Sequence, residues 1–105
     1  MLIMNMGKRL LAAVEAGRAT IIKEITVDLS APLEDEPLDL GDIQTITAWA
    51  VKDLTDGAAV TVAMDGNPVT VAAGENRDRL QGEALTVTTE GGTDWAMVLE
   101  IHGRA

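Results

Sequence analysis

Residues 60–72 read V-T-V-A-M-D-G-N-P-V-T-V-A, and this stretch decides the fold. Apolar side chains alternate with small or polar ones on both sides of the central D-G-N-P, which is the period of a β-strand with one buried face. The dipeptide Asp65-Gly66 favours a tight reversal between two antiparallel strands, because both residues tolerate a left-handed backbone. The stretch therefore predicts a β-hairpin.

The same period of two recurs on both sides of this hairpin. Residues 21–29, 85–88 and 95–102 place apolar side chains at alternate positions. Residues 43–51 are rich in β-branched and aromatic side chains, which is typical of a strand. The eleven threonines of the chain fit this picture, because a β-branched side chain suits a pleated, half-exposed surface. The sequence therefore predicts about six to eight short strands.

Turn residues separate these strands at short intervals. No segment between them is long enough for the crossover helix that a parallel sheet needs. We therefore predict an all-β domain over residues 20–105, an antiparallel β-sandwich with jelly-roll-like topology. The one long connection, residues 31–42, carries two prolines and five acids. It is predicted to lie on the surface without regular structure.

Residues 1–19 differ from the rest of the chain in pattern and in charge. Ile3, Met6 and Leu10 recur at helical spacing, whereas Lys8 and Arg9 lie off that stripe. We predict a helical or extended amphipathic arm in which these five residues bind a partner. A helix that packs on its own domain is the alternative. The apolar run after Arg9 is too short for a secretory signal.

Charge is distributed unevenly between the start of the chain and the remainder. Residues 1–23 hold four basic residues and one acid, a net charge of +3. The remainder holds four basic and sixteen acidic residues, a net charge of −12. An acidic surface repels phosphate groups, so we predict neither nucleic-acid binding nor binding to an anionic membrane.

The inventory of reactive side chains is small. The chain has one serine, Ser30, one histidine, His102, and neither cysteine nor tyrosine. A hydrolytic pair would need these two residues to meet, and neither lies in a nucleophile turn. We therefore predict no enzyme activity and no catalytic residue. A single histidine without cysteine predicts no metal site, and the lack of a glycine-rich phosphate loop predicts no cofactor.

Two further patterns have a functional and a structural interpretation. The acids of residues 31–42 are potential Ca²⁺ ligands, but they lack the alternating spacing that places ligands around one ion, so a solvated segment is preferred. Trp95 shares the parity of its apolar neighbours and is assigned to the core. Trp49 shares the parity of Thr45, Thr47 and Val51 and is interpreted as exposed, where it offers a stacking surface for a sugar. A sugar site built on one tryptophan without tyrosine partners is expected to be weak.

Three short motifs resemble one family. Residues 25–31 read I-T-V-D-L-S-A, residues 35–38 read D-E-P-L, and residues 77–80 read R-D-R-L. They resemble the I-D-L-S-x-A…D-E-P-L opening and the F-D-R-L step of small β-rich virion structural proteins from tailed bacteriophages. The resemblance covers roughly residues 24–102. It departs at Arg77, where the family pattern has phenylalanine, so an apolar anchor is expected to be missing there.

The resemblance implies a non-enzymatic component of a virion. A capsid decoration or cement protein is the function expected first, with the major capsid protein as partner. Small identical subunits usually form closed symmetric oligomers, and a trimer suits the threefold positions of a shell. The alternatives are a carbohydrate-binding module that uses Trp49, and an accessory protein of the phage tail or neck.

Overall fold

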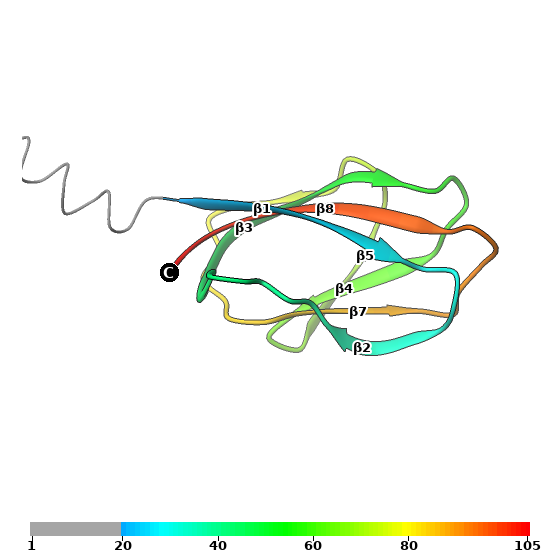
Figure 1. Ribbon diagram of the computed structural model, residues 1–105, viewed down its shortest axis with the longest axis horizontal. Helices are drawn as coiled ribbons and strands as arrows, with labels where there is room; N and C mark the ends of the chain where they lie inside the picture. Colours follow the sequence, from blue (N-terminus) through cyan, green and yellow to red (C-terminus); the bar gives the residue numbers. More distant parts are fainter. Residues whose placement is uncertain (1–19) are drawn as a thin grey trace, which may run out of the picture.

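The computed structural model describes residues 20–105, which form eight β-strands and no helix (Figure 1). Every pairing between these strands is antiparallel, which confirms the predicted all-β, antiparallel class. The predicted N-terminal arm, residues 1–19, lies outside the described residues. The strands are β1 (Ile21–Asp28), β2 (Leu33–Pro37), β3 (Thr45–Leu54), β4 (Val60–Met64), β5 (Asn67–Val71), β6 (Asn76–Arg77), β7 (Leu85–Thr89) and β8 (Ala96–Arg104).

Strands β4 and β5 form the hairpin predicted from residues 60–72. Met64 pairs with Asn67, so Asp65 and Gly66 alone make the reversal. Both have positive φ, 50° and 87°, as a two-residue type I′ turn requires. The Asp65 carboxylate accepts hydrogen bonds from two backbone N–H groups just before β7, at 3.0 and 3.1 Å. The turn is therefore fixed by its own backbone and by a contact to the neighbouring strand.

The strands are arranged in two four-stranded sheets. Sheet 1 has the order β1-β8-β3-β6, and sheet 2 has the order β2-β7-β4-β5. The pairs β1·β8, β2·β7, β3·β6 and β4·β5 are nested around the Asp65-Gly66 turn, and successive pairs fall alternately in the two sheets. Figure 1 shows β1 beside β8 and β2 beside β7. The chain thus runs as one long doubled-back ribbon that passes from sheet to sheet.

One hydrophobic core joins the two sheets. Alternate residues of β8, β4 and β7 face it, as the period of two predicts. Burying one such aliphatic side chain contributes about 1.5–3 kcal/mol. The result is a sandwich-like, two-sheet domain. Its buried members are Val27, Leu29, Leu40, Ile43, Ile46, Trp49, Val51, Val60, Val62, Val71, Leu85, Val87, Met97, Leu99 and Ile101.

A bulge in β3 changes which of its side chains face the core. Ile46 and then Ala48 pair with consecutive residues of β8, so Thr47 between them is an extra residue without a partner. Regular alternation would place Ile46 and Trp49 on opposite faces. The bulge shifts the parity by one, and both side chains are buried. Trp49 is 3% exposed, so the prediction of an exposed Trp49 is wrong.

The acid-rich residues 31–42 contain a strand, so the prediction of a connection without regular structure is wrong. β2 pairs with β7 through Leu33, Glu36 and Pro37, with a register shift between the first two. Leu33 packs against the core while the acids that follow it are exposed. Charge and proline are the features by which proteins protect an edge strand, so this composition suits an edge as well as a loop.

Candidate functional site

The outward face of sheet 1 brings ionisable side chains of β1, β3 and β8 together. Glu24 lies directly across from Glu100, and Ile22 lies across from His102. His102 Nε2 lies 2.8 Å from Glu100 Oε1. Lys52 Nζ lies 3.9 Å from Glu100 Oε2. Directly opposed carboxylates such as Glu24 and Glu100 repel one another. The contacts of Glu100 with His102 and Lys52 offset that repulsion.

The hydrogen bond from His102 holds the pKa of Glu100 below its usual value. Partial desolvation acts in the opposite direction, and the positive charge of Lys52 adds to the lowering. Both partners reach Glu100 because they lie on its face of the sheet, His102 two residues along the same strand. The spacing E-x-H on a predicted strand could have indicated the contact.

We expect acid to remove a stabilising contribution of Glu100. A carboxyl whose pKa is lower in the folded protein stabilises the fold above its ordinary pKa, and this contribution is lost as pH falls through the folded value. Below the ordinary pKa of 4.5, the free energy of unfolding should fall more steeply with acidification in the wild type than in Glu100→Gln. Urea unfolding at a series of pH values measures this. Equal slopes for the wild type and Glu100→Gln would contradict the assignment.

The structure does not bring Ser30 and His102 together. The Ser30 backbone N–H donates to Asp28 Oδ1 at 2.9 Å, in the exposed turn that follows β1. Hydrogen bonds from Ser30 hold the pKa of Asp28 below its usual value. His102 pairs with Ile22 near the other end of β1. At about 3.3 Å per residue, Ile22 and Asp28 lie ~20 Å apart, so this serine and histidine form no nucleophile–base pair.

A pocket of about 230 Å³ opens between the edge strands β5 and β6. Arg77 pairs with Trp49 and therefore shares its side of sheet 1. The Arg77 guanidinium contacts Glu75 at 2.7 Å. Arg77 is thus one of the residues around this mostly apolar hollow. The lining residues are Trp49, Met64, Asn67, Val69, Arg77 and Leu80.

Filling this pocket should stabilise the protein. We expect Arg77→Phe to raise the free energy of unfolding by about 0.5–2 kcal/mol, the usual gain from cavity filling. The lost ion pair with Glu75 is partly solvent-exposed, and its loss offsets less than about 1 kcal/mol of this gain. Asn76→Phe places the same ring on the outward face and is the matched control. If thermal unfolding shows Arg77→Phe to be no more stable than Asn76→Phe, the pocket does not accept the ring.

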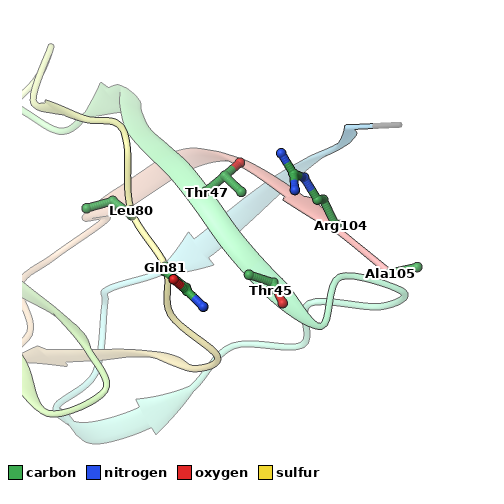
Figure 2. Close-up of a pocket in the computed structure, with 6 residues that line it drawn as sticks. All are labelled: Thr45, Thr47, Leu80, Gln81, Arg104 and Ala105. Atoms are coloured by element: carbon green, nitrogen blue, oxygen red, sulfur yellow. The ribbon is translucent and has the colours of Figure 1, made fainter. Parts of the chain in front are cut away.

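A second hollow, of about 460 Å³, lies over β3 beside the end of β8 (Figure 2). Thr45 pairs with Arg104, and the Leu80 backbone N–H donates to the Thr47 carbonyl at 2.9 Å. The lining offers hydroxyl, amide and guanidinium groups, which suit polar contact with a partner and supply no acid–base pair. The residues drawn in Figure 2 are Thr45, Thr47, Leu80, Gln81, Arg104 and Ala105.

The residues that the structure describes, 20–105, offer neither a cluster of metal ligands nor a membrane-spanning helix. No group of three histidine, aspartate or glutamate side chains in this part of the chain could hold a metal ion. None of these residues belongs to a helix that is long and apolar enough to cross a bilayer.

The sequence-predicted site residues divide into two groups. Trp49 lies in the core, so its ring offers no face to a sugar. The arm residues lie outside the described part of the chain, and their role stays a prediction. They are Ile3, Met6, Lys8, Arg9 and Leu10.

Comparisons with protein-family models, curated proteins and solved structures found no match to this chain.

Proposed function

We propose that this protein is a non-enzymatic bacteriophage virion protein, a capsid decoration or cement protein. The observation that carries the proposal is the strand order, β1-β8-β3-β6 against β2-β7-β4-β5. On the same observation we propose that the two sheets form a jelly roll, since nested pairs that alternate between two sheets are its topology. Jelly rolls are common in viral capsid proteins.

The phage resemblance supports the proposal because its motifs lie where this fold needs them. In the first motif, Leu29 is fully buried and Asp28 holds the turn after β1. Leu38 of the second motif and Leu80 of the third pack against the core. These residues build the architecture and do not form a reactive site. A shared fold alone leaves function open, so the proposal needs a test on particles.

The chemistry of the described residues supports a binding role over catalysis. Ser30 and His102 lie near opposite ends of β1, and the two hollows expose no paired acid and base. The burial of Trp49 removes the residue on which the carbohydrate-binding alternative depends. A tail or neck accessory protein remains the other outcome of a localisation experiment.

The positive charge of residues 1–19 supports the proposal that the arm binds an assembly partner. In this proposal Lys8 and Arg9 steer association with an acidic surface, and the apolar stripe supplies affinity. The major capsid protein and other copies of this chain are the proposed partners. The localisation is the virion.

Electron microscopy of virions that carry a labelled copy of the protein tests the proposal. We expect the label at regular positions over the head. A label confined to the tail or neck, or absent from purified virions, would contradict a capsid decoration protein.

A further inference from the structure

One large apolar side chain projects from the outward face of sheet 1. Ile22 on β1 is 61% exposed, and no other large hydrophobic side chain in the described part of the chain is exposed. It lies directly across from His102 on β8. A single exposed aliphatic side chain is ordinary on a protein surface, so it indicates a contact only together with a hollow that fits it.

The pocket between β5 and β6 is such a hollow. Its volume of about 230 Å³ is below the roughly 300–1,000 Å³ of sites that enclose a small-molecule ligand, so it suits one side chain. Trp49, Met64, Val69 and Leu80 make the lining mostly apolar, and Arg77 is its one charged residue. An apolar occupant would give these wall atoms the contact partners that an open pocket lacks.

The charges beside Ile22 and beside the pocket are opposite. Glu24 lies two residues from Ile22 on the same face of β1, about 6.7 Å along the strand. It is directly across from Glu100, and no ion pair between described residues includes it. Arg77 contacts Glu75 through one nitrogen, and a guanidinium has five N–H donors. Arg77 can therefore donate to a second carboxylate at the mouth of the pocket.

We propose that Ile22 of one copy inserts into the pocket between β5 and β6 of a second copy. Glu24 then meets Arg77 of the partner subunit. A second copy is the occupant because this chain offers both halves of the contact, an apolar side chain beside a carboxylate and an apolar pocket beside a guanidinium. The inference rests on the proposed function, because it names the contact between copies of the decoration protein.

This contact joins two different surfaces of the same chain. β1 and β6 are the opposite edges of sheet 1, so each copy can bind one neighbour through Ile22 and another through its pocket. A contact of this kind builds a closed ring, or an open filament where the rotation does not close. The trimer expected from shell symmetry is such a ring. Association should therefore continue past two subunits.

Filling the pocket and removing the inserted side chain test the contact in the full-length protein. Arg77→Phe is expected to be at least as stable as the wild type, so weaker association would not reflect unfolding. We expect Arg77→Phe and Ile22→Ser each to raise the dissociation constant for self-association at least about tenfold, as measured by sedimentation equilibrium. The matched control Asn76→Phe should not weaken it. A monomeric wild type, a species that stops at a dimer, or unchanged association of Ile22→Ser would overturn the contact.

Charge reversal tests the pairing of Glu24 with Arg77 of the partner subunit. Glu24→Lys and the control Glu34→Lys, on β2, change the net charge equally, so both relieve the general repulsion between acidic copies to the same extent. At about 0.15 M salt, we expect the dissociation constant of Glu24→Lys to be at least about fivefold higher than that of Glu34→Lys. Equal constants would overturn this pairing.

Disulfide formation tests where Ile22 lies in the assembly. The chain has no cysteine, so each introduced thiol is unique. Under mild oxidation, Ile22→Cys mixed with Asn67→Cys, at the pocket, should form far more mixed disulfide than Ile22→Cys mixed with the control Thr86→Cys, on the central strand β7. Equal yields in the two mixtures would overturn the placement.

Binding to virion heads separates this inference from the proposed function. If the wild type binds heads but Arg77→Phe and Ile22→Ser self-associate as the wild type does, the contact between copies alone is overturned. If both variants weaken self-association as expected but the wild type does not bind heads, the proposed function alone is overturned.

Discussion

Replacing Trp49 with alanine should lower the free energy of unfolding by about 3–5 kcal/mol, the usual cost of removing a large aromatic side chain from a core. Trp49 is 3% exposed and belongs to the same buried cluster as Ile46 and Val51. A domain has a total stability of only about 5–15 kcal/mol, so the variant loses a large share of it. Equilibrium unfolding in urea measures the loss.

Trp95→Ala is the matched control for this substitution. Trp95 is half-buried and packs beside Gly92 in the turn before β8, so its removal should cost less than the removal of Trp49. A Trp49→Ala protein that is as stable as the wild type but has lost binding to a glycan would contradict the buried placement. That result would also favour the carbohydrate-binding alternative.

Deleting residues 1–17 should leave the domain folded and abolish its attachment to particles. Within the part of the chain that the structure describes, the buried core residues lie between Val27 and Ile101, so we expect the melting temperature to stay close to that of the full chain. The deletion removes three apolar side chains of the stripe, whose burial would contribute on the order of 5 kcal/mol before the entropy of association is subtracted.

Two full-length variants separate charge from apolar contact in the arm. Reversing Lys8 and Arg9 to glutamate should slow association, most strongly at low salt, because exposed charges act over roughly the Debye length. Replacing Ile3 and Leu10 with serine should mainly speed dissociation. Loss of folding in the truncated protein would mean that the arm belongs to the core. Unchanged particle binding would mean that the arm makes no contact there.

Much of the fold is predictable because its signals are local. Val60 and Val62 alternate with polar or small residues, since β4 has one face on the core. Asp65-Gly66 predicts the reversal because few dipeptides adopt two positive φ angles in succession. These features depend on neighbouring residues in the chain, so the all-β class and the β4–β5 hairpin can be derived without the structure.

The errors arise where the outcome depends on a partner strand. Trp49 becomes a core residue because Thr47 is unpaired on β8, and no alternation within β3 reveals that bulge. The acidic run at residues 34–36 becomes a strand because β7 leaves an edge beside it. The pocket beside Arg77 lies between β5 and β6, which are edge strands of different sheets. Such contacts join residues far apart in the sequence.

Binding of the full-length protein to purified phage heads that lack it tests the decoration proposal most directly. Co-sedimentation across a concentration series gives the affinity and the number of copies bound, and tails purified from the same phage serve as the comparison. We expect saturable binding to heads at a fixed ratio to the major capsid subunit, and none to tails. Absence of head binding at micromolar protein, or saturable binding to tails instead, would contradict it.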